Sequence, residues 1–529
     1  MRFLIGVDIG TQGSKGALIS ETGLILASCS IEQNVSSPRP GWAEHDADRA
    51  WWGGFVEVVR LLLLQSQVAP HQIAGVGVSG LMPVMLPVDA DGRPLRPAIL
   101  YADTRAHAEM VRMNEQLAGS GSSVLVAHDV GPKIVWFRDH EPTRWQRTHS
   151  ILSTQGYVIA KLTGRYVIDS FTALGMRPFI NLPRNGWNVD NCDRFGVAIE
   201  LLPDIVGTTD VVGTITAEAA AETGLADGTP VIGGAADFIA EMISTGAATE
   251  GEVAVSYGTT LCLTAFSRRP IRHGPGFVDM LQHHQDLSQL YPGLYAVGAG
   301  MATSGALTRW FRDQFGQTER RVEQELGVNA YELLGIEAAK APPGADGLIV
   351  LPYFSGERSP IHDDWARGVI FGLTLAHGRG HLYRALLEGV AYGLQHNLEL
   401  MRDAGITPSR IVATGGGSRS HLWTQIVSDV TGLPQEVAAP SNAALGMAFL
   451  AGYSSEIFSQ ISDVRQWVRP ERIVHPRAEI HDLYQKYYAV YRRLYEQTKE
   501  EMHDLVRISE EALAGPPPPA GSSITIRAS

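Results

Sequence analysis

The sequence predicts an α/β protein built from two domains of the same kind. A strand, a Gly-Thr turn and a second strand occur at residues 3–19 and again at 252–265. Apolar, β-branched strands such as 73–80 alternate with helical patterns, which is typical of sheets covered by helices. The 529 residues also exceed what one hydrophobic core usually supports. The repeat therefore predicts two βββαβαβα domains that face one another across a cleft.

The composition restricts the class of partner. A net charge of -13 argues against a nucleic acid or an anionic membrane, since both need clustered Lys and Arg. Cys29, Cys192 and Cys262 are spaced unlike any zinc motif and are typical of a reduced, cytoplasmic protein. The N-terminus enters a strand directly, and no stretch is typical of a signal peptide or a membrane span. We therefore expect a cytoplasmic protein that binds small molecules.

The first hairpin presents an acid at its tip. The strand 3–9 brings Asp8 to a turn that contains Gly10, Thr11 and Gly13. Glycines let backbone N–H groups approach anionic oxygens, a hydroxyl can donate to them, and a carboxylate can hold hydrated Mg²⁺. The spacing is not that of a P-loop, and an ordinary edge hairpin is the alternative interpretation.

Polar side chains follow two further strands of the first half. Met82 comes just after the strand 73–80, and Tyr101 and Asp103 follow the strand 98–100. Ligands of open α/β sheets bind beyond the carboxyl ends of the strands, so these residues predict a binding rim. His128 precedes a helical pattern, although a lone histidine is more often a surface residue than a ligand.

A second acid stands at a strand end. The apolar strand 229–236 leads to Asp237, and small residues before it leave room for a ligand. A carboxylate in such a place can act as general base on a hydroxyl. The alternative is a helix cap, because a helical pattern starts at Phe238 and aspartate often caps helices; the two roles are compatible.

The second half repeats the phosphate-binding design. The second hairpin has Gly258, Thr259 and Thr260 in its turn. The strand from Ile411 ends in glycines at 415–417, and a helix is expected from about 420 to 430. A flat adenine ring can lie against backbone without side chains, and phosphates can meet a helix N-terminus.

Several of these motifs resemble those of a known family. Asp8-x-Gly10-Thr11-x-x-x-Lys15 resembles the first phosphate motif of the actin, hexokinase and sugar-kinase superfamily. The segments 348–360 and 368–389 are similar to the FGGY carbohydrate kinases, and within that family to xylulokinases. The resemblance implies two ribonuclease-H-like domains around a central cleft. We expect a sugar-binding domain at 1–247, an ATP-binding domain at 248–508 and a polar, Pro-rich tail at 509–529.

The resemblance also implies an activity and its residues. It implies ATP-dependent phosphorylation of a sugar hydroxyl, with D-xylulose, giving D-xylulose 5-phosphate, as the leading substrate. Asp237 would be the general base, and Asp8 would hold Mg²⁺ through water. The residues expected to contact ATP are Thr11, Gln12, Lys15, Gly258, Thr259, Thr260, Gly305, Gly416, Gly417 and Ser418. Those expected to contact the sugar are Met82, Tyr101, Asp103, His128, Asp237 and Phe238.

The sugar and the class of function keep alternatives. Pro83, Ala102 and Phe238 stand where xylulokinases have polar residues, so ribulose, erythritol or a hexulose stays open as the substrate. A homodimer also stays open as the oligomeric state. An actin-like ATPase would share the hairpins but would not need the rim at 80–105. A non-catalytic sugar-binding regulator would need a damaged Asp8 or Asp237 and an added DNA-binding segment, and neither occurs.

Overall fold

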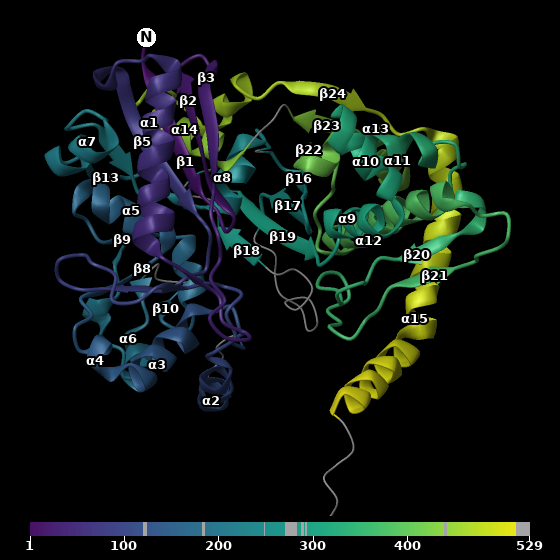
Figure 1. The fold of residues 1–529 in the computed structure, drawn as a ribbon, viewed down its shortest axis with the longest axis horizontal. Helices are drawn as coiled ribbons and strands as arrows, with labels where there is room; N and C mark the ends of the chain where they lie inside the picture. The colour runs from purple at the N-terminus through teal and green to yellow at the C-terminus, as the bar shows by residue number, and fades with distance from the viewer. Residues whose placement is uncertain are drawn as a thin grey trace, which may run out of the picture. The chain divides into compact units, whose positions relative to one another are not determined.

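The computed structural model describes residues 1–119, 124–181, 186–247, 249–269, 290, 294–438 and 442–514, and the backbone of 283–286. The chain forms two compact units (Figure 1). The first unit comprises Met1–Ala248, Gln285–Leu294 and Ala438–Pro470; the second comprises Thr249–His284, Tyr295–Val437 and Glu471–Ser529. Among the described helices, none has the length and apolar character that crossing a membrane requires.

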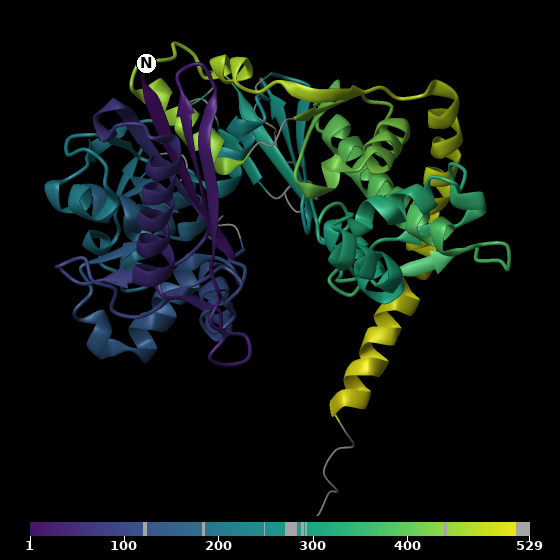
Figure 2. The same ribbon diagram turned by 45° about the horizontal axis from the view of Figure 1, so that its top comes forward.

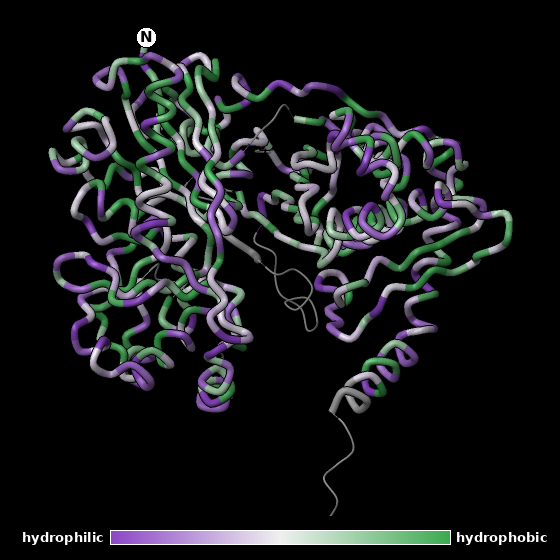
Figure 3. Tube along the Cα trace, in the orientation of Figure 1, coloured by the Kyte–Doolittle hydropathy of each residue, from purple (hydrophilic) through white to green (hydrophobic). Residues whose placement is uncertain are grey.

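A seven-stranded mixed sheet forms the centre of the first unit. β1, β2 and β3 form an antiparallel meander, and β5 pairs in parallel with β1 on one side and with β14 and β15 on the other. In spatial order, the strands are β13 (Val211–Thr214), β14 (Pro230–Ile232), β5 (Ile73–Gly80), β1 (Phe3–Ile9), β2 (Gly13–Ser20) and β3 (Ile25–Glu32), and β15 (Ala235–Ala236) also pairs with β5. Apolar residues concentrate in these central strands (Figure 3).

Short two-stranded sheets accompany the main sheet of the first unit. They are β4 (Glu44–His45) with β7 (Ala98–Ile99), β6 (Leu86–Val88) with β8 (Ser150–Leu152), β9 (Val167–Asp169) with β12 (Asp204–Val206), and β10 (Ile180–Asn181) with β11 (Gly186–Trp187). The helices of this unit are the π-helix η1 (Ala47–Gly53), α1 (Gly54–Ser66), α2 (His107–Leu117), α3 (Val130–His140), α4 (Pro142–Trp145), α5 (Thr154–Thr163), α6 (Val189–Arg194), α7 (Ala217–Thr223), α8 (Asp237–Ser244) and α14 (Ala443–Ser454), with 3₁₀ turns η2 (Pro70–Gln72), η3 (Thr172–Met176), η5 (Ile199–Leu201) and η8 (Ile461–Gln466).

Glycines let α14 lie directly on the sheet. A Cβ atom on Gly6 of β1 would collide with the Ala444 carbonyl oxygen, and one on Gly77 of β5 would lie 2.6 Å from the Met447 carbonyl oxygen. Gly446 meets the backbone of Ala240 in α8 equally closely. The helix therefore packs against β1, β5 and α8 (Figure 2). α1 packs on β2 and β3 across the opposite face, where Val58 lies against Gly16.

This packing also determines which compact unit α14 belongs to. The predicted ranges 1–247 and 248–508 assign α14 to the second domain, whereas the structure groups it with the first unit. The physical reason is the backbone contact that small residues permit between α14 and the first sheet. The chain thus returns to its first unit after most of the second is complete.

The second unit has a sheet of the same design. β16 and β17 repeat the hairpin, and β22 pairs with β16 in parallel, as β5 does with β1. In spatial order the strands are β18 (His283–Asp286), β19 (Tyr295–Met301), β17 (Leu261–Ser267), β16 (Glu252–Tyr257), β22 (Arg410–Thr414), β23 (Gln435–Ala438) and β24 (Pro470–Val474). β20 (Ile349–Leu351) and β21 (Val369–Phe371) form a separate hairpin.

Helices complete the second unit. They are α9 (Gly305–Phe315), α10 (Gln317–Leu326), α11 (Ala330–Ala338), α12 (Arg379–Asp403), α13 (His421–Thr431) and α15 (Ala478–Ala514), with 3₁₀ turns η6 (Ala345–Gly347) and η7 (Gly416–Arg419). The predicted helix at 420–430 is confirmed as α13, which Ser420 caps by accepting the Trp423 N–H. α15 extends to Ala514, so the tail predicted from 509 does not begin there; residues 515–529 lie outside the described part.

The α14 packing generates a stability prediction. Gly446→Ala should destabilise the protein by about 1–3 kcal/mol, because overpacking against backbone cannot be relieved by a side-chain rotation. Gly335→Ala in α11 is the matched control, because no atom lies within 4 Å of its new Cβ atom and alanine favours helices. Differential scanning calorimetry measures both variants, and a Gly446→Ala transition at the wild-type temperature would contradict the packing argument.

Candidate active site

Three neighbouring strands deliver polar side chains to one edge of the first sheet. In the register, Asp8 of β1 lies opposite Ser79 of β5, and Ser79 lies opposite Ala235 of β15 on its other side. β15 ends at Ala236, and Asp237 follows at once as the first residue of α8. Parallel pairing on both sides of β5 therefore brings the two predicted acids to the same sheet edge, as the sequence patterns indicate.

Asp8 is held by a hydroxyl. The Ser79 hydroxyl donates to Asp8 Oδ1 at 2.8 Å. Burial raises the pKa of Asp8, and the Ser79 hydrogen bond and the Lys15 ammonium oppose that rise. Lys15 is the residue paired with Asp8 across the hairpin and is exposed. Ser79 is a residue that the sequence analysis missed, because only the pairing of β1 with β5 makes it Asp8's neighbour.

Asp237 is an acid of unusually low acidity. Its Oδ1 accepts the N–H of Phe238 at 2.7 Å, while Ala236 occupies the cap position of α8. The Asp237 carboxylate therefore accepts a hydrogen bond at the start of α8, although the cap residue is Ala236. Burial raises the pKa of Asp237 to about 7, and the nearby Asp8 carboxylate contributes to that rise.

The pair of acids suits a hydrated divalent cation. Among the described residues, no group of three His, Cys, Asp or Glu side chains could hold a metal ion. Mg²⁺ usually keeps several waters and takes one or two carboxylates plus phosphate oxygens. The Asp8 carboxylate raises the pKa of Asp237, so a positive charge beside Asp8 would offset that effect, and Asp8 fits such an ion.

The first hairpin tip lies beside the predicted sugar rim. The turn is closed by a hydrogen bond from Gly10 N to Gly13 O at 2.9 Å. Thr11 Oγ1 lies 3.5 Å from the hydroxyl of Tyr101. Gln12 and Lys15 are exposed. One predicted phosphate contact and one predicted sugar contact are therefore brought together.

The predicted sugar contact of Asp103 is not supported. Its side chain is fully buried, and Oδ2 accepts the N–H of Ala43 at 2.7 Å. Arg105 donates three hydrogen bonds to the same carboxylate, from its backbone N, Nε and Nη2. These four bonds occupy the carboxylate, so Asp103 holds the turn at 101–105 in place and has no oxygen left for a sugar.

Lys133 ties two predicted sugar-binding segments together. It is fully buried, and its Nζ donates to the carbonyl oxygens of Leu100 at 2.8 Å, Tyr101 at 3.2 Å and His128 at 3.4 Å. Burial lowers its pKa to about 8, against the opposing effect of Asp103 and Asp129. Lys133 could not be identified from the sequence, because nothing local shows where a buried lysine finds its acceptors.

The other predicted sugar contacts occupy the same part of the first unit. Met82 and Phe238 are half-buried and directly follow β5 and Asp237. His128 is exposed just before α3. These three predicted sugar contacts therefore lie close to the ends of β5 and β15 and to the start of α3.

The second hairpin turn is joined to the start of α9. Gly305 N donates to Gly258 O at 2.9 Å, and Ala306 N donates to Thr259 O at 2.9 Å. A Cβ atom on Gly305 would lie 2.5 Å from the Gly258 carbonyl oxygen, so glycine is required for this approach. Thr259 itself is exposed, and Thr260 is half-buried. Hydrogen bonds thus join the predicted ATP contacts at 258–260 to the predicted contact Gly305.

The glycine-rich turn after β22 lies beside the same hairpin. Parallel pairing places Thr414 opposite Ser256, so the segment 415–418 follows next to the end of β16. Gly415 adopts a φ of 84° and packs on the Tyr257 backbone, while Gly416 has open space at its Cβ position. The Ser418 hydroxyl donates to the Gly415 carbonyl at 2.7 Å. The predicted contacts Gly416, Gly417 and Ser418 therefore gather near the second hairpin.

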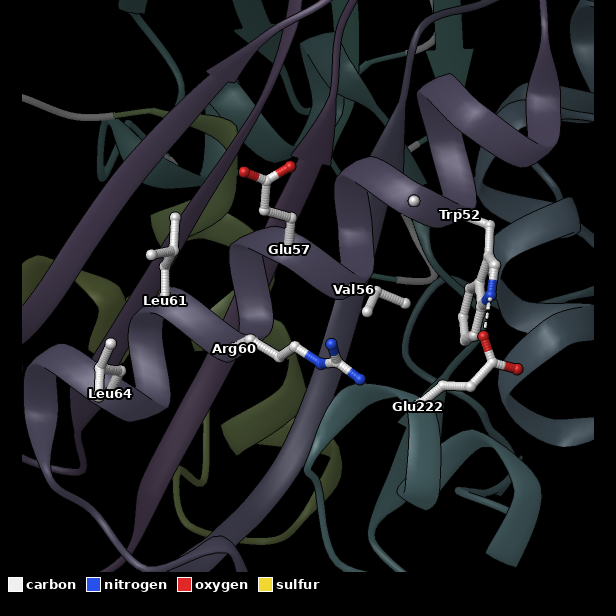
Figure 4. Close-up of a pocket in the computed structure, with 8 residues that line it drawn as sticks. Trp52, Val56, Glu57, Arg60, Leu61, Leu64 and Glu222 are labelled. Carbon is white, nitrogen blue, oxygen red and sulfur yellow. Dashed lines mark hydrogen bonds between the residues drawn. The ribbon is translucent and has the colours of Figure 1, made fainter.

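A separate groove of about 410 Å³ lies in the first unit (Figure 4). η1, α1 and α7 form it, and the Trp52 ring nitrogen donates to Glu222 at 2.8 Å. Its lining residues are Trp52, Gly53, Val56, Glu57, Arg60, Leu61, Leu64 and Glu222, none of which is a predicted site residue.

Comparison with known proteins identifies the family. Residues 3–244 match the N-terminal domain of the FGGY family of carbohydrate kinases, and residues 253–455 match its C-terminal domain. The xylulose kinase of Bacillus subtilis (strain 168) is 29% identical over 507 residues, which are 94% of this chain and 98% of the relative. The gluconokinase of the same organism is 28% identical over 477 residues, 87% and 90% of the two chains.

A solved structure agrees with the fold. The crystal structure of xylulose kinase from Rhodospirillum rubrum has a TM-score of 0.83 and 32% sequence identity, covering 95% of this chain and 100% of that one. The predicted two-domain fold and the predicted resemblance are thereby confirmed. The chain belongs to the FGGY family of carbohydrate kinases and is an ATP-dependent sugar kinase.

Proposed function

We propose that this kinase phosphorylates a pentulose, with D-xylulose as the leading substrate, and that Asp237 is its general base. The observation that carries the proposal is the placement of Asp8 and Asp237 at adjoining strand ends, with the pKa of Asp237 raised to about 7. The relatives named xylulose kinase support the choice of sugar, and the gluconokinases keep a sugar acid among the alternatives.

Asp237 takes the proton of the attacking hydroxyl. As the sugar oxygen forms its bond to the γ-phosphorus, the bond to the leaving ADP oxygen breaks and the hydroxyl proton passes to the Asp237 carboxylate. A base works best with a pKa near the operating pH, which the value of about 7 satisfies. The Phe238 N–H fixes the orientation of the carboxyl group by its bond to Oδ1.

Asp8 would hold Mg²⁺ through water. The ion neutralises charge on the phosphate oxygens when it is bound. Ser79 keeps Asp8 in one orientation by donating to Oδ1. Thr11, Gln12 and Lys15 lie in the same hairpin and contact the phosphates of ATP.

The second unit binds the nucleotide. Backbone N–H and hydroxyl groups at 258–260 hold phosphate, which is the use that glycine-containing turns serve at anion sites. Gly305 admits the close approach of α9 to this turn. Gly416 and Gly417 offer backbone for the adenine ring, next to Ser418.

The first unit binds the sugar. Tyr101 reaches the hairpin through the 3.5 Å approach to Thr11, and Met82, His128 and Phe238 line the remaining rim. Asp103 and Lys133 hold the rim in place through buried hydrogen bonds. We further propose a cytoplasmic enzyme that can form a homodimer.

Replacement of the proposed base tests the mechanism. Asp237→Asn should lower kcat by about 10²–10⁴-fold, because a positioned general base contributes that much, and should leave the Kd of ADP near the wild-type value. Asp227→Asn, at an exposed aspartate of the first unit, is the control. A variant that keeps more than about a tenth of the wild-type kcat would exclude Asp237 as the base.

The same variant should be more stable than the wild type at high pH. The pKa of Asp237 in the folded protein, about 7, exceeds its value in the unfolded chain. At pH values between these two pKa values, the folded state therefore binds more protons than the unfolded chain. Stability therefore falls as pH rises through about 4 to 7, and Asn removes this loss. In the absence of Mg²⁺ and nucleotide, the Tm of Asp237→Asn should exceed that of the wild type by about 2 °C or more at pH 8. The difference should shrink at pH 5, and equal differences at both values would refute the raised pKa.

A substrate panel tests the sugar. Loss of a bonded hydroxyl costs a polar site about 10⁴–10⁵ in discrimination, so the apolar Pro83, Ala102 and Phe238 should alter which hydroxyls are recognised. We expect turnover of D-xylulose, ribulose, erythritol, a hexulose or gluconate, with D-xylulose leading by less than a hundredfold in kcat/KM. A lead beyond a hundredfold would mean that these three positions do not set specificity, and no turnover of any would favour the regulator.

A further inference from the structure

The segment Gly356-Glu357-Arg358-Ser359-Pro360 resembles xylulokinases, but the mechanism above gives it no role. It lies between β20 and β21 in the second unit. Glu357 is 1% exposed, and its Oε1 accepts the N–H of Ala302 at 2.6 Å and that of Arg358 at 2.8 Å. A buried carboxyl group thus binds backbone in the connection between β19 and α9.

The two following residues bind the end of β19, just before that connection. Arg358 Nη2 donates to the carbonyl oxygen of Met301 at 3.0 Å, and Ser359 N donates to that of Gly300 at 3.1 Å. A Cβ atom on Gly300 would lie 3.0 Å from Arg358 Nη2, so the guanidinium group lies directly against that backbone. Residues 357, 358 and 359 therefore bind residues 302, 301 and 300, one to one.

The far end of the connection carries the second hairpin turn. Ser304 N and Ala306 N both donate to Thr259 O, at 3.2 and 2.9 Å, and Gly305 N donates to Gly258 O. Only Thr303 separates these bonds from Ala302. Hydrogen bonds thus hold the short connection at both ends, to residues 357–359 on one side and to the turn at 258–259 on the other, with Thr303 between them.

We propose that residues 357–359, here called the bracing turn, position the Gly258-Thr259 turn for the phosphates of the nucleotide, with Glu357 as the main positioning residue. The inference rests on the proposed function, because it takes the second hairpin to be a nucleotide contact. It assigns the bracing turn to nucleotide affinity rather than to sugar affinity.

The state of the Glu357 carboxyl group makes the proposal testable. Burial raises its pKa to about 8, so the group is mainly neutral near pH 7. Within the described part of the chain, its Oε2 atom has no hydrogen-bond partner. Because the accepting atom is Oε1 of a neutral group, glutamine can replace it with little loss. Alanine would leave two N–H groups without that acceptor.

Calorimetric titration with ADP and Mg²⁺ at pH 7 tests the inference. Glu357→Ala should raise the Kd of ADP about tenfold, because an N–H group that loses its acceptor lets the connection move. Glu357→Gln should stay within about threefold of the wild type. The Kd of the best sugar in the panel should change by less than about twofold in both variants.

Glu388→Ala is the matched control for loss of a buried carboxyl group. Glu388 is also 1% exposed in the second unit, but its Oε1 is bonded to Arg384, Tyr484 and Gly344. It should lower the Tm and leave the Kd of ADP unchanged. Should Glu357→Ala not fold, Arg358→Met removes the bond to Met301 and should raise the Kd of ADP about fivefold.

The outcomes separate the inference from the function on which it rests. Wild-type affinity for ADP in the folded Glu357→Ala variant, or in Arg358→Met, would overturn the proposal. Equal losses in Glu357→Ala and Glu388→Ala would also overturn it, since they would indicate a general effect on stability. If Glu357→Gln weakened ADP binding as much as Glu357→Ala does, Glu357 could not act as a neutral hydrogen-bond acceptor. A wild-type protein that binds no ADP would instead refute the proposed function.

Discussion

The parallel pairing of β5 with strands on both sides is the interaction on which the candidate site of the first unit depends. It places Asp8, Ser79 and Asp237 on three adjoining strands or their ends. Two acids held this way raise the proton affinity of Asp237, which costs stability in the empty protein. Other contacts must offset that cost, and the close backbone packing of α14 on Gly6 and Gly77 involves the same two strands, β1 and β5.

Backbone contacts without intervening side chains recur in the second unit. Gly305 brings α9 against the Gly258 carbonyl oxygen, and Gly415 brings the turn after β22 against Tyr257. Such contacts fix a loop to about the precision of a secondary-structure element, because backbone has no rotamers to exchange. A turn that binds phosphate by its N–H groups gains from this precision, since its donors must be preorganised to bind charge well.

Sequence patterns could predict what depends on neighbours along the chain. The two hairpins, the strand that leads to Asp237 and the helix after Ser420 are signalled locally by apolar runs, glycines and a cap residue. The bonds of Asp103 to Ala43 and of Lys133 to Leu100 could not be predicted, because these partners lie 60 and 33 residues away along the chain. The same limit applies to α14: its small residues indicate close packing but do not identify the surface against which they pack.

The two units use buried carboxyl groups in opposite ways. Asp237 must be ionised before it can accept a proton. It lies near Asp8, which is paired with Lys15 across the hairpin, and a cation bound there would favour the charged form of Asp237. Glu357 lies beside a cation as well, but the Arg358 guanidinium donates to the Met301 carbonyl oxygen. Burial raises the pKa of Glu357 to about 8, against the lowering effects of two backbone N–H groups and of Arg358, and the group serves as a neutral acceptor. What separates the two groups is therefore what they contact: Glu357 holds two backbone N–H groups inside the fold, whereas Asp237 is half-buried and lies near a second carboxylate.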